Sequence, residues 1–503
     1  MTDTPLTQRE SIHLVDPRDH VATALRDIVA GETLDLDGRT ITARATIPKG
    51  HKIAIRAAKA GEDVLKYGWP IGRAVIDIAV GDHVHVHNVA TRLEGVEDFT
   101  WAPARPERRD GGGGDRTFDG YRRKNGRAGT RNEIWVLCTV GCVANTARRI
   151  AEKASQRFAG RVDGVYAFPH PFGCSQLGDD LAHTRKLIAA LASHPNAGGV
   201  LILGLGCENN QLKALLDGAQ EIDRDRLKSF TTQMVEDELE DGLAAVEVLV
   251  EIAERDQREP IPVSELVVGL KCGGSDGFSG VTANPLVGRI ADKVADAGGT
   301  PVLTEIPEVF GAEGVLLARA ASREVFDQAV GVIDDFKRYF IDNNQPIYEN
   351  PSPGNIAGGI TTLEEKSLGA VQKGGRAPLV EVLRYGERVG PHGLTLLEAP
   401  GNDAVSSTAL TAAGATVILF TTGRGTPLGF PAPTLKIASN SGLAQRKPGW
   451  IDFDAGQVLA GVSMETAADA LMDLVIDTAS GKPTKAELNG EREIAIWKSG
   501  VTL

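Results

Sequence analysis

Three histidines alternate with valines in one short run of the chain. His83, His85 and His87 lie in the run GDHVHVHN, residues Gly81–Asn88. Because successive side chains of a strand point to opposite faces, this spacing predicts three imidazoles on one face. Imidazole titrates near neutral pH and is a common ligand of divalent metals. The run therefore indicates acid–base chemistry or metal binding, and a solvated strand face is the alternative interpretation.

Four cysteines each follow an apolar run of the kind that forms a buried strand, namely Cys142, Cys174, Cys207 and Cys272. Ligands of open parallel sheets bind outside the carboxyl ends of the strands, so we expect these thiols to line one crevice. Thiolates there favour bound iron or an iron–sulfur cluster, whereas any single cysteine is alternatively a small buried apolar side chain. No C-x-x-C pair occurs, so neither a zinc ribbon nor a thiol redox protein is favoured.

A glycine-rich loop, KCGGSDGFSG at Lys271–Gly280, joins an expected strand to a helix that begins near Asn284. Free backbone amides at the start of a helix bind anions. The loop has neither the phosphate-loop spacing nor the dinucleotide-binding spacing, so a carboxylate is favoured over a nucleotide phosphate. A plain turn is the alternative interpretation. Arg131, earlier in the chain, offers a planar fork for a carboxylate.

These candidate residues need a framework that positions them. Residues 11–100 contain short alternating runs and turn signals, which predict a small β domain. After a Pro- and Gly-rich stretch, apolar β-branched runs alternate with helical patterns, which is typical of α/β units on a largely parallel sheet. We expect a β domain at 1–103, a linker at 104–118, a central α/β domain at 119–380 and a Rossmann-like α/β lobe at 381–503.

The composition limits the classes of function. The 503 residues, with 42% hydrophobic and 24% charged side chains, are typical of a globular protein of several domains. A net charge of -13 repels polyphosphate, so nucleic acid is not an expected partner. No apolar run reaches the roughly 18 residues of a membrane span, and the odd number of cysteines favours reduced thiols. We therefore expect a cytoplasmic protein that binds no membrane.

Several separate motifs resemble those of the altronate/galactarate dehydratase family. Besides Gly81–Asn88 they are GCSQLGDD at 173–180, GLGCENNQ at 204–211 and CGGSDG at 272–277. The similarity extends over nearly the whole chain, and includes the segment 348–354 and the ending KSGVTL. It implies an N-terminal SAF-type β-clip domain followed by two α/β lobes.

The resemblance also implies an activity. It implies a hydro-lyase of hexuronate catabolism that converts D-altronate to 2-dehydro-3-deoxy-D-gluconate with the help of Fe²⁺, for which Mn²⁺ is a possible substitute. Galactarate is the nearest alternative substrate, and sulfolactate sulfo-lyase is a more distant relative. We expect a homo-oligomer that binds a small sugar acid. A non-catalytic sugar-acid binding module is the alternative from another class of protein.

The motifs that carry the resemblance supply the expected site residues. Removing the weakly acidic proton beside a carboxylate requires a base and stabilisation of the enediolate, for which a Lewis-acidic iron is suited. His85 and His87 are the expected base and acid. The expected iron ligands are Cys174, Cys207, Cys272 and Cys142. The expected contacts to substrate are Asn88, Arg131, Ser275 and Asp276.

Overall fold

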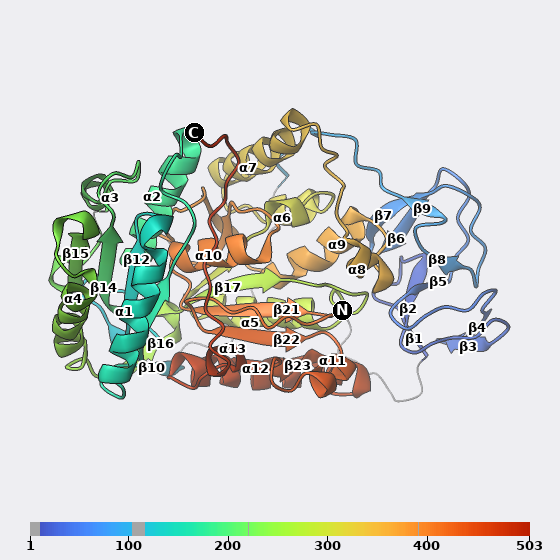
Figure 1. Cartoon of the computed structure of the whole chain (residues 1–503). Helices are drawn as coiled ribbons and strands as arrows, with labels where there is room; N and C mark the ends of the chain where they lie inside the picture. Colours follow the sequence, from blue (N-terminus) through green and yellow to red (C-terminus); the bar gives the residue numbers. More distant parts are fainter. Residues whose placement is uncertain (1–10, 103–115, 220, 391) are drawn as a thin grey trace.

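The computed structural model describes residues 11–102, 116–219, 221–390 and 392–503, which form three parts in a row (Figure 1). The expected linker at 104–118 lies outside the described residues as far as residue 115. Among the described residues, no helix is long and apolar enough to cross a bilayer. The predicted fold class, a small β domain followed by α/β lobes with largely parallel sheets, is confirmed.

The N-terminal domain consists of short antiparallel strands joined by tight turns. Its sheets have the strand orders β1-β2-β5-β8, β6-β7-β9 and β3-β4. Small buried apolar side chains such as Ile28, Ile47 and Ile53 fill one half of its interior. The strands are β1 (Ile12–His13), β2 (Val21–Ala24), β3 (Thr33–Leu36), β4 (Arg39–Thr42), β5 (Lys52–Ala54), β6 (Asp63–Lys66), β7 (Trp69–Ala74), β8 (His83–Val84) and β9 (Val89–Ala90).

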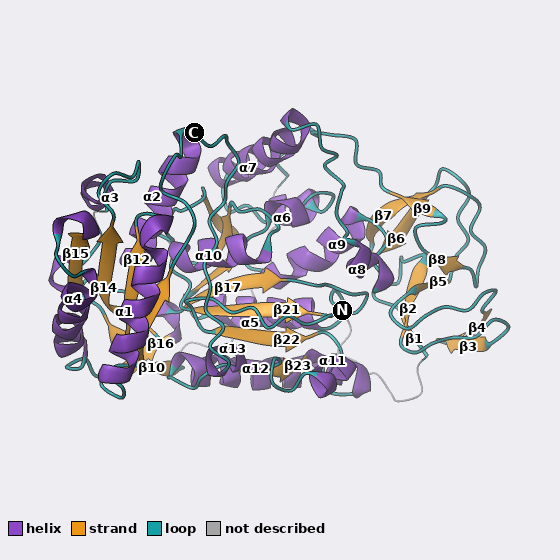
Figure 2. Ribbon diagram, viewed as in Figure 1, coloured by secondary structure: helices purple, strands orange, loops and turns teal. Residues whose placement is uncertain are grey.

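The second part is a four-stranded parallel sheet of order β13-β12-β14-β15. Every residue of β12 and β14 is buried, as expected for a parallel sheet with helices on both faces (Figure 2). A small antiparallel sheet of order β11-β10-β16 lies beside it. The elements are β10 (Thr117–Arg122), β11 (Ala128–Gly129), β12 (Glu133–Cys138), α1 (Ala144–Arg157), β13 (Gly164–Phe168), α2 (Gly178–Ala192), β14 (Ala197–Gly204), α3 (Leu212–Gly218), β15 (Leu227–Thr231), α4 (Glu238–Ala253) and β16 (Glu259–Pro262).

The third part is a seven-stranded parallel sheet of order β19-β20-β18-β17-β21-β22-β23, again flanked by helices. Its strands are β17 (Val267–Cys272), β18 (Thr300–Leu303), β19 (Leu379–Leu383), β20 (Leu394–Leu397), β21 (Val417–Thr422), β22 (Thr434–Ala438) and β23 (Phe453–Asp454). Its helices are α5 (Ala283–Asp296), α6 (Glu313–Leu317), α7 (Arg323–Asp342), α8 (Pro353–Ala357), α9 (Leu363–Ala370), α10 (Asp403–Ala413), α11 (Ser441–Arg446), α12 (Met464–Ala479) and α13 (Lys485–Leu488).

Residue 380, the expected junction between the two lobes, lies inside strand β19 of this sheet. Strands β17 and β18 precede that position and pair with β21 and β20, which follow it. The seven-stranded sheet is therefore continuous across the expected junction, and the change from one sheet to the next comes between β15 and β17. Apolar runs along a chain predict strands but not which strands share a sheet, so this arrangement was not predictable from the sequence.

Candidate functional site

The run of histidines forms a strand end followed by a turn rather than one continuous strand. Strand β8 contains only His83 and Val84, and the chain turns through the next four residues. Asn88 fixes this turn, because its Oδ1 accepts from the backbone N–H of His85 at 2.9 Å and its Nδ2 donates to the carbonyl oxygen of His83 at 2.9 Å. Asn88 is buried. Its polar groups therefore fix the turn that carries the histidines.

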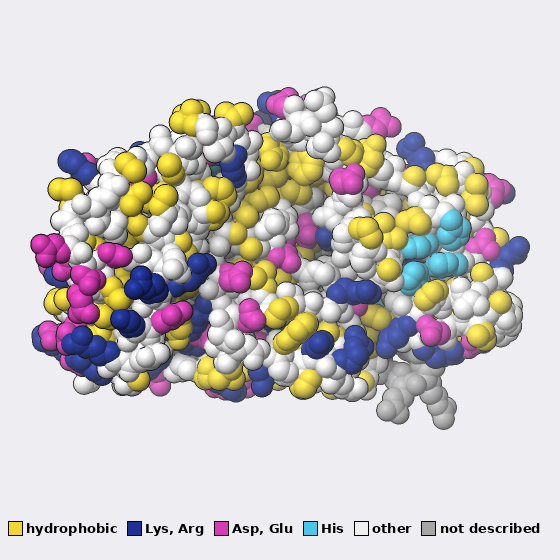
Figure 3. All heavy atoms as spheres, in the orientation of Figure 1, with side chains coloured by type: hydrophobic (Ala, Val, Ile, Leu, Met, Phe, Trp, Pro, Cys, Tyr) yellow, Lys and Arg dark blue, Asp and Glu magenta, His cyan; other side chains and the backbone are white. Residues whose placement is uncertain are grey.

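The turn still brings the imidazoles together, and a fourth histidine joins them. The ring centroids of His83 lie 5.6 Å from His85 and 5.4 Å from His87. This fourth histidine, His51, was not predicted from the sequence. Its Nδ1 lies 3.0 Å from Nε2 of His83, and its ring centroid lies 4.8 Å from that of His85. The pairing of β5 with β8 places His51 there, and no local pattern reveals that pairing. The histidines gather on one face of the N-terminal domain (Figure 3).

Burial keeps the inner imidazoles neutral. Burial first, and then the neighbouring charges of His51 and His87, lower the pKa of His83 to about 4. Burial, followed by Lys52 and His51, lowers the pKa of His85 to about 3. His87 is exposed at the surface of the cluster. The arrangement therefore combines neutral imidazoles inside with one imidazole that can exchange protons with solvent.

The segment between α8 and α9 covers the inner side of the histidine cluster. His85 Nδ1 lies 3.2 Å from Oγ1 of Thr361, and His51 Nε2 lies 3.4 Å from the carbonyl oxygen of Ala357. Lys52 donates to the carbonyl oxygen of Gly359 at 2.6 Å. The histidines therefore lie at the boundary between the N-terminal domain and the third part of the chain.

The glycine-rich loop meets the same boundary. The backbone N–H of Gly277 donates to the carbonyl oxygen of Gly358 at 2.7 Å, and a Cβ at Gly277 would lie 2.0 Å from the carbonyl oxygen of Gly50. Only glycine permits this close approach. Ser275, which is buried, accepts a hydrogen bond on its carbonyl oxygen from Asn355 at 2.8 Å. The loop therefore supports the segment that covers the histidines.

Asp276 is buried, and both oxygens of its carboxylate accept hydrogen bonds from within the protein. Its Oδ1 accepts hydrogen bonds from the backbone N–H of Phe278 and from the backbone and hydroxyl of Ser279, and also from the hydroxyl of Ser439 at 2.8 Å. Its Oδ2 accepts from Asn440 at 3.0 Å. This network fixes the shape of the loop, and Oδ2, with one hydrogen bond, is the less occupied of the two oxygens.

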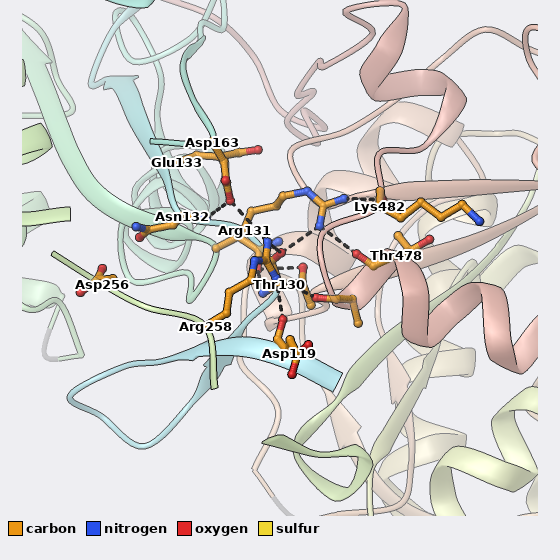
Figure 4. Close-up of polar contacts among 12 residues, drawn as sticks. Asp119, Thr130, Arg131, Asn132, Glu133, Asp163, Asp256, Arg258, Thr478 and Lys482 are labelled. Carbon is orange, nitrogen blue, oxygen red and sulfur yellow. Dashed lines mark hydrogen bonds and ion pairs between the residues drawn. The ribbon is translucent and has the colours of Figure 1, made fainter. Parts of the chain in front are cut away.

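Arg131, another expected contact to substrate, is hydrogen-bonded within the protein in this structure. Its guanidinium donates to both oxygens of Glu487, at 2.9 and 3.0 Å, and to the carbonyl oxygens of Thr130, Thr478 and Lys482. These five bonds use all five N–H groups of the side chain. Arg131 thus extends from the second part of the chain to the C-terminal helices and ties them together (Figure 4). A local sequence pattern does not distinguish such a tie from a ligand-binding arginine.

The four expected metal-binding thiols fall into two groups. Cys142, Cys174 and Cys207 are exposed and follow β12, β13 and β14 of the four-stranded sheet. Cys272 is buried at the end of β17 in the seven-stranded sheet. Figure 1 shows β12 and β14 at the opposite end of the molecule from β8. Within one chain, the three exposed thiols therefore do not join the histidines.

Cys272 forms a buried group with Glu305 and Glu308, whose donor atoms all lie within 4.8 Å of one another. This distance suits a single metal ion. Each donor already faces a lysine ammonium, however: Lys373 lies 2.8 Å from the sulfur of Cys272, Lys366 lies 2.8 Å from Glu308, and Lys271 contacts Glu305.

The charges of this group determine its protonation. Burial and the adjacent Glu308 raise the pKa of Glu305. Burial acts in the same direction on Glu308, but Lys366 and Lys373 outweigh it and hold the pKa of Glu308 below its usual value. Burial also raises the pKa of the Cys272 thiol. Three ammonium groups therefore face the two carboxylates and the thiol, and a cation bound here would have to displace them.

The fold and three family models that match its three parts in order define the class of protein. The model of the altronate/galactarate dehydratase SAF domain matches residues 10–92. The D-galactarate dehydratase/altronate hydrolase second-domain model matches residues 120–254, and the D-galactarate/altronate dehydratase C-terminal model matches residues 263–502. The chain belongs to the altronate/galactarate dehydratase family.

Individual relatives match along nearly the whole length. Altronate dehydratase of Bacillus subtilis (strain 168) is 50% identical over 496 residues, which cover 97% of this chain and 99% of that protein. Altronate dehydratase of Escherichia coli (strain K12) is 49% identical, covering 96% of this chain and 98% of that protein. Galactarate dehydratase (L-threo-forming) of Escherichia coli (strain K12) is 36% identical, covering 87% and 86%.

Proposed function

We propose that the protein is a hydro-lyase that converts D-altronate to 2-dehydro-3-deoxy-D-gluconate in hexuronate catabolism. The observation that carries this proposal is the 49–50% identity to two altronate dehydratases over at least 96% of the chain. The galactarate dehydratase is less similar, at 36% identity, so altronate is favoured over the diacid. The free cysteines support a cytoplasmic location, since disulfides are rare in that compartment.

The histidine cluster is the proposed site of proton transfer. Loss of water moves the proton on the carbon beside the carboxylate to a base, and the hydroxyl on the next carbon leaves as water after it gains a proton. The enol that remains then becomes the 2-keto acid. We assign the proton transfers to His85 and His87, because one imidazole is neutral and shielded while the other reaches solvent. Asn88 fixes the turn that carries these histidines, and Oγ1 of Thr361 lies 3.2 Å from Nδ1 of His85.

Iron is the proposed cofactor, with Mn²⁺ as a possible substitute. When bound, it would supply Lewis-acid stabilisation of the substrate oxygens. The buried group of Cys272, Glu305 and Glu308 is not proposed as its site, because lysines already neutralise it. The exposed thiols of Cys142, Cys174 and Cys207 are softer donors and suit iron better, but iron held there would not reach a substrate at the histidine cluster of the same chain (Figure 1).

Anaerobic turnover tests the proposal. D-altronate and galactarate are each incubated with the protein and ferrous iron, and 2-keto acid formation is followed beside a chelator-treated control. Iron-dependent turnover of D-altronate alone is the expected result. Turnover of galactarate alone would move the substrate assignment to the diacid. If neither acid reacts, while D-altronate still binds, the protein is a sugar-acid binding module instead.

A further inference from the structure

Three cysteines follow three neighbouring strands of one parallel sheet. Cys142 lies in a short helical turn (Gly141–Val143) after β12, Cys174 in the loop after β13, and Cys207 in the loop after β14. The order β13-β12-β14 makes β12 the central strand of the three. Parallel strands place their carboxyl ends at one edge of the sheet, so the three loops emerge side by side.

Backbone and amide hydrogen bonds join these loops directly. Gly141 N–H donates to the carbonyl oxygen of Phe172 at 2.8 Å, which links the Cys142 turn to the Cys174 loop. Asn210 N–H donates to the carbonyl oxygen of Gly173 at 3.0 Å, and Ser175 N–H donates to Oδ1 of Asn209 at 2.8 Å. These bonds link the Cys174 loop to the Cys207 loop. The three thiols therefore lie on one connected framework.

Backbone positions with a positive φ flank two of the thiols. Gly173 has φ +100°, and a Cβ there would lie 2.1 Å from the carbonyl oxygen of Thr139. Ser175, on the other side of Cys174, has φ +56° although it is not glycine. Gly206, before Cys207, has φ +134°. In a residue other than glycine, such as Ser175, a positive φ persists where the surrounding contacts enforce it. Residues of this kind are concentrated at functional sites.

Two further anchors hold the loops from outside. Glu208 accepts from the hydroxyl of Thr139 at 2.6 Å and from the backbone N–H groups of Leu205 and Gly206, so its carboxylate closes the Cys207 loop. On the other side, the backbone N–H of Leu503 donates to the carbonyl oxygen of Ser175 at 3.0 Å. The loops are thus held in position without using the thiols.

The thiols have no charged partner among the hydrogen bonds of the described residues. Cys174 lies 3.8 Å from the hydroxyl of Ser175, and Gln233 donates to the sulfur of Cys207 at 3.8 Å. Within the described part of the chain, only the Cys272 group has three donor atoms within 4.8 Å of one another. The three exposed thiols are therefore spaced more widely than a single ion can bridge.

We propose that Cys142, Cys174 and Cys207 ligate one iron–sulfur cluster. A cluster of several irons spans thiols that are too far apart for one ion, and thiolates are its ordinary protein ligands. Each thiol loses its proton to solvent as its sulfur binds iron. Since a cubane cluster takes four ligands, three thiolates leave one iron without a cysteine. This inference rests on the proposed function in one respect, the choice of iron as the cofactor, and it names the form and the ligands of that iron.

Anaerobic reconstitution of the full-length protein tests the cluster. The protein is incubated with equal amounts of ferrous and ferric iron, sulfide and a thiol, and is then desalted. Bound iron, bound sulfide, visible absorption and the EPR spectrum after reduction are measured. We expect about four irons and four sulfides per chain. Cys142→Ala, Cys174→Ala and Cys207→Ala should each lose most of the iron, the sulfide and the visible absorption. Their far-UV circular dichroism should match the unsubstituted protein, because all three side chains are exposed.

Cys138→Ala and Cys272→Ala are the matched controls, since both thiols are buried and lie outside the framework. Both should keep the cluster. Retention of iron and sulfide in all three loop variants would overturn the inference, as would iron or zinc bound without sulfide. Turnover is measured separately: a cluster without altronate turnover contradicts only the proposed function, and turnover by a protein that binds no sulfide contradicts only the cluster.

Discussion

Lys52 of the N-terminal domain and Glu365 of helix α9 form an ion pair of 2.9 Å in which both side chains are fully buried. Lys66 approaches the other oxygen of Glu365 at 2.9 Å. Burial lowers the pKa of Lys52 to about 8, while the two lysines outweigh burial at Glu365 and lower its pKa to about 2. A single carboxylate therefore balances the charge of two buried ammonium groups at the boundary where the histidines lie.

Replacing this carboxylate should destabilise the protein strongly. Glu365→Gln leaves two buried lysines without a counter-charge, so we expect the free energy of unfolding to fall by about 3–5 kcal/mol. Urea unfolding followed by circular dichroism measures the change. The matched control is Glu324→Gln on the exposed surface of α7, which should shift stability by less than about 0.5 kcal/mol. Equal effects of the two substitutions would contradict the role of the buried pair.

Stability should fall as the pH decreases from about 6.5 towards 4. An unfolded histidine binds a proton in this window, whereas His83 and His85 stay neutral until about pH 4 and 3. The unfolded state therefore binds more protons, and stability rises with pH across the window and is fully present above it. Urea midpoints at a series of pH values measure this dependence.

The doubly substituted protein His83→Gln/His85→Gln should have a shallower dependence over the same window. Some dependence should remain, because burial also lowers the pKa of His13 to about 4 and of His194 to about 3. An unchanged slope would show that the two inner imidazoles are not shielded from protons in solution.

Loss of the proposed proton-transfer groups should lower kcat. His85→Gln and His87→Gln should each reduce kcat for D-altronate by about 10²–10⁴-fold, because general acid–base catalysis contributes this much. KM should change little for His87→Gln, whose side chain is exposed. His392→Gln, an exposed histidine outside the cluster, is the control and should retain full activity. Full activity in both cluster variants would refute the assignment.

Arg131 offers a test that separates a structural role from substrate binding. Arg131→Lys cannot satisfy the five acceptors that the guanidinium reaches, so we expect a loss of about 1–3 kcal/mol in the free energy of unfolding. At a temperature where the variant is folded, KM for D-altronate should be unchanged. A large increase in KM with unaltered stability would instead support a direct contact between Arg131 and the substrate, as expected from the sequence.

The fold class was predictable because buried parallel strands appear in the sequence as continuous apolar runs between helical patterns. The residues of β14, Ala197–Gly204, are an example in which every position is buried. The assignment of β17 and β18 to one sheet with β20 and β21 was not predictable, since that pairing depends on contacts between segments far apart in the chain.

The candidate site was predictable only where its residues lie close in sequence. The run from His83 to His87 identified the histidine cluster, but His51 enters it through strand pairing, which no local pattern encodes. The side chains of Asn88, Arg131 and Asp276 have the chemistry of substrate ligands. In the folded chain these side chains form hydrogen bonds with other parts of the protein, and the partners cannot be identified from the sequence.

Helix α9 carries three consecutive side chains that each contact a different partner. Glu364 accepts from Thr91 at 3.0 Å, Glu365 pairs with the two buried lysines, and Lys366 lies 2.8 Å from Glu308. A rotation or axial shift of this eight-residue helix would break all three contacts at once. These contacts connect the N-terminal domain to the ion pairs around Cys272. Local unfolding of either region should therefore raise hydrogen exchange in the other.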